Sequence, residues 1–187
     1  MAISKNNAIT FGASGTFAQQ MVIRQQGGKT VLCKRPVKGK SKYPEKEQQM
    51  RDRFLEASLY ARAAISHEPT RLAYQAAADK GQSAYNMAVA DFYIAPVIRS
   101  VDSTAYTGAA GSTIRVRAID NFGVQAVSVE IQLASGETLE KGNAAADVNG
   151  LDWLYTATQP NEALAGSKLI IRASDLPGNV TVHEVTL

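Results

Sequence analysis

Three aspartates come nearest to a chemical site in this sequence, because each lies where a strand-like segment begins or ends. Asp120 and Asp175 follow alternating apolar runs at turns, and Asp102 lies near the start of the same region. If all three met at one end of a sandwich, they would offer hard oxygen ligands to calcium. Aspartates also occupy such turns because their side chains bond to the local backbone. We favour this second interpretation, so the sequence predicts no metal and no other cofactor, with calcium as the alternative.

Residues suited to catalysis are scarce. Two histidines and one cysteine cannot assemble a Cys/His zinc site or a disulfide framework. The sequence has no Gly-x-Ser-x-Gly elbow, Walker loop, dinucleotide-binding fingerprint or His-Glu-x-x-His motif. His67 beside Glu68 could act as a base with its orienting partner, but its place before Pro69 favours a solvent-facing loop. Cys33 is interpreted as a small apolar strand residue rather than a reactive thiol. The chain is therefore predicted not to be an enzyme.

The charge of the chain is divided unevenly at Pro96. Residues 1–95 carry 14 Lys and Arg against 7 Asp and Glu, a net charge of +7, whereas residues 96–187 carry 6 against 10, a net charge of −4. The densest basic stretch, Lys29 to Lys46, is interrupted by prolines and a glycine, which predicts an exposed linker. We expect it to be a solvated linker or to dock on an acidic neighbouring subunit, with contact to nucleic-acid phosphates as the alternative. The basic residues assigned to this contact are Lys34, Arg35, Lys38, Lys40 and Lys42.

Residues 1–35 are predicted to form a β-hairpin. Two strand-like runs, 16–25 and 29–35, flank Gly27-Gly28, a pair that readily takes the positive φ angles of a tight turn. A lone hairpin is marginal in water, so this ribbon must pack on the helices or on another copy of the chain. Alternation places three apolar residues of the first run on one side, and they are assigned to this contact: Phe17, Met21 and Ile23.

Residues 45–95 are predicted to be helical. Pro69 is well placed in the first turn of a second helix, and Ser83 can cap a third, which Pro96 stops. The first helix has an apolar stripe at helical spacing, formed by Met50, Phe54, Ala57, Ala61 and Ile65. The inner face of the second helix is predicted to comprise Leu72, Ala73, Ala76 and Ala77. The segment therefore reads as a small helical hairpin or three-helix unit.

From residue 97 onward the period of the apolar residues changes from 3.6 to 2, which is typical of half-buried antiparallel strands. Turn signals separate about seven such strands over about 90 residues, a spacing expected of a β-sandwich. With 187 residues, 45% of them apolar, the chain has enough material for a real core. Trp153 and Tyr155 alternate with Leu154 and are assigned to that core, with a carbohydrate-stacking platform as the alternative.

Recurring turn and aromatic positions accompany this alternation. They are Ile114-x-Val116-x-Ala118-x-Asp120-Asn-x-Gly123, Val127-x-Val129-x-Ile131, Trp153-x-Tyr155-Thr156, Gly166, and Ile171-x-Ala173-x-Asp175-x-x-Gly178-Asn179. With this pattern, roughly the last 90 residues resemble bacterial immunoglobulin-like domains, which occur in cell-surface adhesins, carbohydrate-active enzymes and bacteriophage virion proteins. The resemblance implies a fold more than a function, because such domains serve as spacers, binders and assembly modules.

The first half is similar to uncharacterised proteins of gut Bacteroidetes and their phages. The similarity lies in Phe11-Gly-x-x-Gly15-x-Phe17, Arg24-Gln-x-x-Gly28-Lys-Thr-Val and Arg53-Phe-x-x-Ala57-Ser-x-Tyr60-Ala61. It implies a role in particle or surface structure.

The predicted fold class is α+β, with an N-terminal β-hairpin and short helical unit in residues 1–95 and an all-β immunoglobulin-like sandwich in residues 97–187. The predicted function is a non-enzymatic assembly subunit, most of all a phage-type virion component, whose first half joins copies of the chain or other structural subunits. A glycan- or surface-binding module is the alternative, and nucleic-acid binding comes third. No apolar run has the length of a membrane span, and the start lacks the apolar stretch of a secretory signal. We therefore expect synthesis in the cytoplasm and incorporation into a virion.

Overall fold

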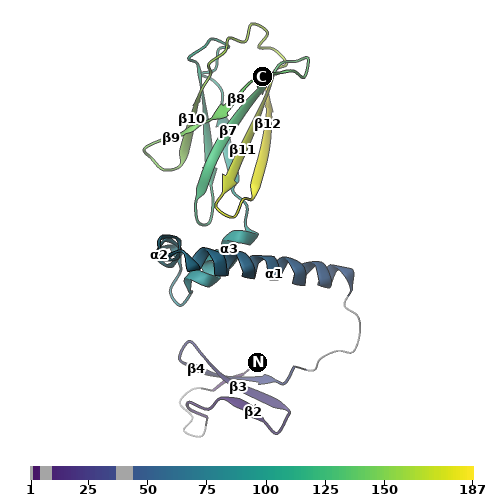
Figure 1. Cartoon of the computed structure of the whole chain (residues 1–187), viewed down its shortest axis with the longest axis vertical. Helices are drawn as coiled ribbons and strands as arrows, with labels where there is room; N and C mark the ends of the chain where they lie inside the picture. The colour runs from purple at the N-terminus through teal and green to yellow at the C-terminus, as the bar shows by residue number, and fades with distance from the viewer. Residues whose placement is uncertain (1, 5–9, 37–43) are drawn as a thin grey trace. The chain divides into compact units, whose positions relative to one another are not determined.

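The computed structural model describes residues 2–4, 10–36 and 44–187 of the chain. It confirms an α+β fold that consists mostly of antiparallel strands: along the chain, an N-terminal sheet is followed by three helices and then by a C-terminal sandwich (Figure 1). Contacts divide the chain into two compact units, Met1–Arg51 and Asp52–Leu187. The boundary predicted near Pro96 lies inside the second unit, between the helices and the sandwich.

The N-terminal unit contains a four-stranded sheet in the order β1-β4-β3-β2. Gly27 and Gly28 have φ angles of 56° and 72°, and they form the predicted turn between the two central strands. The run predicted as one strand from residue 16 to 25 is instead bent into a second hairpin, because Ala18 and Gln19 have left-handed φ angles of 50° and 57°. The predicted ribbon is thus the centre of a larger sheet, whose strands are β1 (Ala2–Ser4), β2 (Gly15–Phe17), β3 (Met21–Gln26) and β4 (Lys29–Lys34).

The two faces of this sheet bury little. Phe17 pairs directly with Met21, and Gly15 with Ile23, so the three predicted apolar residues do lie on one face. Phe17 is nevertheless 63% exposed. Among the described residues of the four strands, only Thr30 and Val31 are buried. Both apolar core clusters found in the described part of the chain lie in the second unit, so this sheet has no comparable core.

Three helices follow: α1 (Glu45–Ser66), α2 (Glu68–Ala77) and α3 (Ala84–Tyr93). Pro69 stands in the first turn of α2, where its missing N–H costs no helical hydrogen bond. The Ser83 side chain accepts a hydrogen bond from the backbone N–H of Asn86 at 3.2 Å and caps α3 as predicted. The starts of α2 and α3 were thus predictable from the sequence.

The helices enclose a small apolar cluster of Ala61, Tyr74, Ala84, Met87 and Ala88. The predicted inner face of α2 is wrong, since Leu72, Ala73, Ala76 and Ala77 are exposed and Tyr74 turns inward instead. The stripe predicted on α1 is buried only in its second part, at Ala57 and Ala61, because Met50 and Phe54 are 72% and 56% exposed. Figure 1 shows that the N-terminal part of α1 extends beyond the other two helices.

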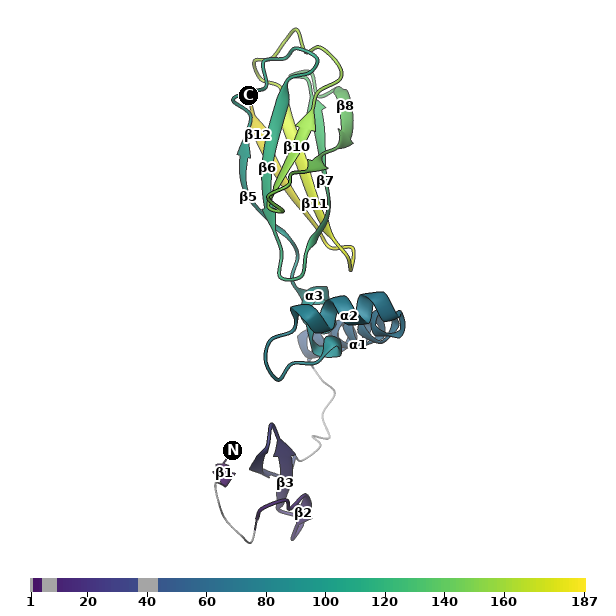
Figure 2. The same ribbon diagram turned by 90° about the vertical axis from the view of Figure 1, so that its left-hand side faces the viewer.

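The rest of the second unit is a sandwich of two four-stranded antiparallel sheets (Figure 2). Its strands are β5 (Val97–Asp102), β6 (Thr113–Ile119), β7 (Val124–Gln132), β8 (Thr138–Asn143), β9 (Ala145–Ala146), β10 (Asp152–Thr156), β11 (Lys168–Asp175) and β12 (Val180–Thr186). The sheet orders are β5-β6-β10-β9 and β12-β11-β7-β8. If β8 is lettered C′ and the other seven strands A to G along the chain, these orders are ABED and GFCC′, the arrangement of an immunoglobulin-type sandwich.

The inward residues follow the predicted alternation. Each of three strands contributes three buried apolar residues to one core: Ile114, Val116 and Ala118; Val127, Val129 and Ile131; Leu169, Ile171 and Ala173. Tyr155 is buried in the same core and Trp153 packs against it. No helix in the described residues is long and apolar enough to cross a membrane.

Candidate functional site

Three aspartates meet where α3 contacts one end of the sandwich. Asp91 lies in α3, Asp120 follows β6, and Asp175 ends β11. One carboxylate oxygen from each lies within 4.8 Å of the others. The two turns involved, between β6 and β7 and between β11 and β12, both lie at the end of the sandwich that faces the helices (Figures 1 and 2).

The turns fix two of these carboxylates through backbone hydrogen bonds. Oδ2 of Asp120 accepts from the backbone N–H groups of Phe122 and Gly123 at 3.1 and 3.0 Å. Oδ1 of Asp175 accepts from Gly178 and Asn179 at 2.9 and 2.6 Å. The favoured sequence interpretation, in which these aspartates bond to their own turns, is confirmed. It also means that both carboxylates are held rigidly.

Asp91 is fully buried and belongs to the contact between α2 and α3. The hydroxyl of Tyr74 donates to its Oδ2 at 2.6 Å, and the hydroxyl oxygens of Tyr74 and Tyr60 lie 2.8 Å apart. The Tyr74 ring stacks on Phe122 with centroids 4.1 Å apart, which joins α2 to the turn that carries Asp120. The inward position of Tyr74 on α2 therefore makes both an apolar contact, with Phe122, and a polar contact, with Asp91.

The environment opposes ionisation of Asp91. Burial raises the pKa of Asp91 from 3.8 to about 6, and the nearby charges of Asp120 and Asp175 act in the same direction, although the Tyr74 hydrogen bond opposes them. Burial also raises the pKa of Tyr74, so its hydroxyl stays protonated and can donate to the carboxylate. The cluster thus gathers more negative charge than its surroundings readily tolerate.

Two carboxylate oxygens of the cluster have no hydrogen-bond partner. Oδ1 of Asp91 and Oδ1 of Asp120 are both buried and unpaired. Among the described residues, the ion pairs of lysine and arginine involve other acids. Two unpaired oxygens beside a third carboxylate can share a proton or bind a cation.

Asp102 does not join the cluster, so the grouping considered in the sequence is wrong in one member. Asp102 pairs with Arg115 near the start of β6, five residues before Asp120. At about 3.3 Å per strand residue, this is a separation of about 16 Å along the sheet. Oδ1 of Asp102 instead accepts from the backbone N–H and the hydroxyl of Thr104, at 3.0 and 2.6 Å. Antiparallel pairing puts the end of β5 at the wrong end of the sandwich.

Asp91 was missed, although the sequence carries a signal for it. It lies on the same helical face as Ala84, Met87 and Ala88, all of which are buried. An acid within an apolar stripe needs a partner, because an unpaired carboxylate is costly to bury. That pattern marks Asp91 as a residue with a specific role.

The predicted interaction residues are divided between described and undescribed parts of the chain. Phe17, Lys34 and Arg35 are exposed, whereas Met21 and Ile23 are partly buried on the first sheet. Three of the predicted basic residues, Lys38, Lys40 and Lys42, lie outside the described residues. His67 is exposed at the start of α2, with Nδ1 2.9 Å from the Thr70 hydroxyl, and Cys33 is half-buried in β4.

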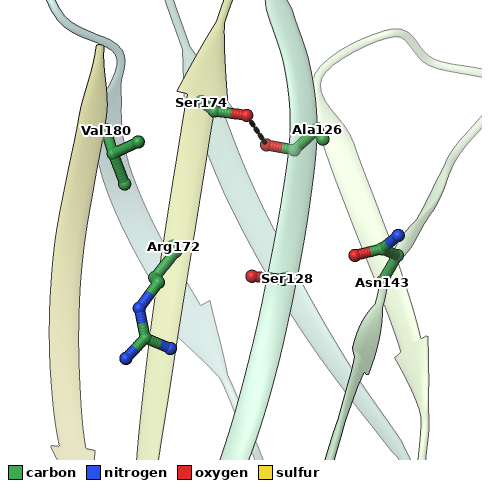
Figure 3. A pocket seen from close by; sticks show the side chains of 6 residues that line it. All are labelled: Ala126, Ser128, Asn143, Arg172, Ser174 and Val180. Carbon is green, nitrogen blue, oxygen red and sulfur yellow. Dashed lines mark hydrogen bonds between the residues drawn. The ribbon is translucent and has the colours of Figure 1, made fainter. Parts of the chain in front are cut away.

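A shallow depression of about 230 Å³ lies on the outer face of the β12-β11-β7-β8 sheet. Figure 3 shows its lining of Ala126, Ser128, Asn143, Arg172, Ser174 and Val180. The Arg172 guanidinium donates to Glu130 at 2.7 Å, and no aromatic ring lines the depression. Of the two rings considered as a sugar-stacking platform, Tyr155 is buried, and Trp153 is partly buried and packs against the same core.

Two solved structures resemble this chain weakly. No protein-family model matches it, and no curated protein matches it. Among solved structures, an engineered protein is similar at 22% identity over 49% of this chain and 18% of its own, with a TM-score of 0.37. CopC from Methylosinus trichosporium OB3b is similar at 17% identity over 48% of this chain and 87% of its own, with a TM-score of 0.36. This chain thus spans less than a fifth of the engineered protein.

Proposed function

We propose that this protein is a non-enzymatic assembly subunit, of the kind found in phage virions, in which the N-terminal region joins copies of the chain. The observation that carries the proposal is the N-terminal sheet without a substantial core. In this proposal the C-terminal sandwich is displayed by the assembly.

The size and exposure of the N-terminal sheet support the need for a partner. Sheets this small are stable when they pack on a further apolar surface, and domains below about 40 residues usually need disulfides, metals or oligomerisation. The single cysteine of the chain excludes an internal disulfide. Large apolar side chains of the unit are meanwhile exposed, with Phe11 at 83% and Phe17 at 63%. Burial of such rings against a second copy would contribute about 25 cal/mol for each Å² of apolar surface removed from water.

The N-terminal part of α1 supplies a second apolar surface. Met50 and Phe54 continue the stripe that Ala57 and Ala61 bury farther along the helix, yet both are exposed. Leu55 and the neighbouring Leu59 are also more than half exposed. Contiguous exposed apolar patches on soluble proteins usually mark interaction sites. Self-association would bury this stripe as well.

The sandwich supports the proposal that the assembly is a phage virion. Its strand order is of the immunoglobulin type, and the sequence of this region resembles immunoglobulin-like domains, which phage virion proteins include among others. Its interior is filled by its own apolar residues, so it can stand on the assembly as a self-sufficient module.

The proposal is tested by the solution mass of the full-length protein, measured by light scattering on a sizing column at low and high salt. We expect a discrete oligomer that persists at high salt, because apolar contacts are not screened. Deletion of residues 1–43 should give a folded monomer, since the second unit keeps both of its cores. A full-length monomer at both salt concentrations, or an oligomer that survives the deletion, would refute the assigned role of the sheet.

A pair of matched double variants removes the ambiguity of a deletion. Phe17→Gln/Met21→Gln makes one face of the N-terminal sheet polar, and Val148→Gln/Leu151→Gln does the same to two exposed apolar residues in the loop before β10. We expect the first variant to dissociate and the second to keep the wild-type mass. Equal masses for the two variants would place the contact elsewhere. Negative-stain electron microscopy of the oligomer should then show regular rings, tubes or fibres if the setting is a virion.

A further inference from the structure

We propose that Asp91, Asp120 and Asp175 form a calcium site that fastens helix α3 to the end of the sandwich. The site is independent of the proposed role in assembly, because every ligand comes from the second unit of a single chain. Its ligands derive from a helix and two separate turns of the sandwich, so the ion would tie together three segments that are distant in sequence.

The spacing of the three oxygens allows one ion to contact all of them. Ca²⁺ binds oxygen at about 2.3–2.6 Å, so two ligands of one ion can be up to about 5.2 Å apart. The three carboxylate oxygens lie within 4.8 Å of one another, which is inside that limit. Mg²⁺ demands near-octahedral geometry and usually keeps several waters, so a buried set of carboxylates favours Ca²⁺. Carboxylates are also the hard oxygen ligands that calcium prefers.

The unpaired oxygens are an independent indication of a ligand. Asp91 is completely buried, and its Oδ1 has no hydrogen-bond partner although its Oδ2 is bound by Tyr74. Oδ1 of Asp120 is likewise buried and unpaired. Buried acceptors are almost always satisfied, and each exception calls for an explanation. A cation among the three carboxylates would satisfy both oxygens together.

The neighbours of the cluster are arranged to hold carboxylates rather than to neutralise them. Backbone N–H groups and the Tyr74 hydroxyl donate to Asp120, Asp175 and Asp91, which orients each carboxylate as outer-shell groups orient metal ligands. In the described part of the chain no lysine or arginine pairs with any of the three. A bound cation would therefore supply the positive charge that no lysine or arginine in the described part of the chain supplies.

The contacts around the site indicate what the ion does. The side-chain amide of Asn179 donates to the backbone carbonyl of Phe92 at 3.2 Å and to Oδ2 of Asp175 at 2.7 Å. The hydroxyl of Thr181 donates to the carbonyl of Pro96, directly after α3. These polar contacts and the Tyr74–Phe122 stack hold the helices on the sandwich. Calcium would add a charged link at the same place and make the two parts one rigid body.

The test is isothermal titration of the full-length protein with CaCl₂ at pH 7.5, after removal of bound metal with EDTA and dialysis. We expect one calcium per chain with a dissociation constant below about 1 mM, the weak limit of natural calcium modules. Asp91→Asn should weaken binding at least about 100-fold, because loss of outer-shell groups alone typically costs 10–100-fold. Asp102→Asn is the matched control, since Asp102 is a strand-end aspartate at the opposite end of the sandwich, and it should bind as the wild type does.

Hydrogen exchange gives a second readout of calcium binding that does not rely on the heat of binding. Calcium should slow exchange at the amides that bind the ligating carboxylates, namely those of Phe122, Gly123, Gly178 and Asn179. Asp120→Asn, which keeps the shape of the side chain, should remove this protection, and circular dichroism should show that it is folded. Absence of binding at several millimolar calcium would overturn the proposal, as would equal binding by Asp91→Asn. Tighter binding of MgCl₂ than of CaCl₂ would overturn the choice of ion.

Discussion

Replacing Asp91 by asparagine should stabilise the calcium-free protein, although it changes a buried side chain that accepts a hydrogen bond from Tyr74. Asparagine has the shape of a protonated aspartate and can still accept the hydrogen bond from Tyr74 through its Oδ1. It has no charge, so it removes the repulsion from Asp120 and Asp175 and the cost of burying a third carboxylate.

The size of the effect follows from the pKa of Asp91. Burial raises this pKa from 3.8 to about 6, so the folded protein binds the proton more tightly than the unfolded chain does. The stabilisation by the bound proton is complete below about pH 4 and is lost as the pH rises through about 6. A difference of about two pH units corresponds to about 3 kcal/mol. At pH 7.5 in EDTA, Asp91→Asn should therefore be more stable than the wild type by about 3 kcal/mol.

The assay is urea unfolding of both proteins in EDTA at pH 4.5 and 7.5, followed by tyrosine and tryptophan fluorescence. The comparison of two proteins at each pH cancels the titration of shared acids that do not interact with Asp91. We expect a gap of about 3 kcal/mol at pH 7.5 that falls to about 1 kcal/mol at pH 4.5. A variant that is no more stable than the wild type at pH 7.5 would refute the destabilisation assigned to the ionised Asp91. A difference in stability that is the same at both pH values would refute it too.

Two further substitutions test the packing around the site and the sandwich. Tyr74→Phe keeps the stacked ring but removes the hydroxyl that donates to Asp91, so urea unfolding in EDTA at pH 7.5 should show a loss of about 1.5–3 kcal/mol. Gly108→Ala should destabilise the protein more than Gly111→Ala does. Both glycines have positive φ angles, 83° and 88°, but a Cβ at residue 108 would lie 2.6 Å from the backbone carbonyl oxygen of Asn161, whereas nothing lies within 4 Å at residue 111. Gly111→Ala should cost about 1–2 kcal/mol for the left-handed backbone alone. Equal melting temperatures for the two variants would show that the backbone at Asn161 moves away from the new Cβ at residue 108 without loss of stability.

The sandwich was predictable because its signals are local and repeated. Alternation in the segments around Val116, Val129 and Ile171 has a period that strands share and helices do not, and turn residues separate the segments. The order of strands within the two sheets depends on which edges pair, which the alternation does not encode. It agrees with the immunoglobulin pattern that the sequence resembles.

The helices were predictable in extent but not in orientation. Alanine packs closely without fixing which face turns inward, so the apolar positions of α2 suggested Leu72 and its neighbours. The buried face is instead set by Tyr74, whose hydroxyl has a partner 17 residues later in the chain, at Asp91. The same limit explains why Asp102 was grouped with Asp120, since proximity in three dimensions depends on the direction in which β5 pairs with β6. Tertiary contacts of this kind have no periodic signature.

The proposed assembly surface and the proposed calcium site can be separated experimentally because they use different parts of the chain. Deletion of residues 1–43 leaves Asp91, Asp120 and Asp175 and the elements that carry them intact, so the shortened protein should bind calcium as the full chain does. Conversely, Asp91→Asn does not alter the exposed apolar residues of the sheet or of α1, so the variant should keep the wild-type mass in light scattering. Loss of calcium binding on deletion would mean that the site needs the N-terminal unit or a second copy. Loss of the oligomer in Asp91→Asn would mean that assembly depends on how firmly the helices are fixed to the sandwich, and α1 would then transmit that dependence because it continues from one unit into the other.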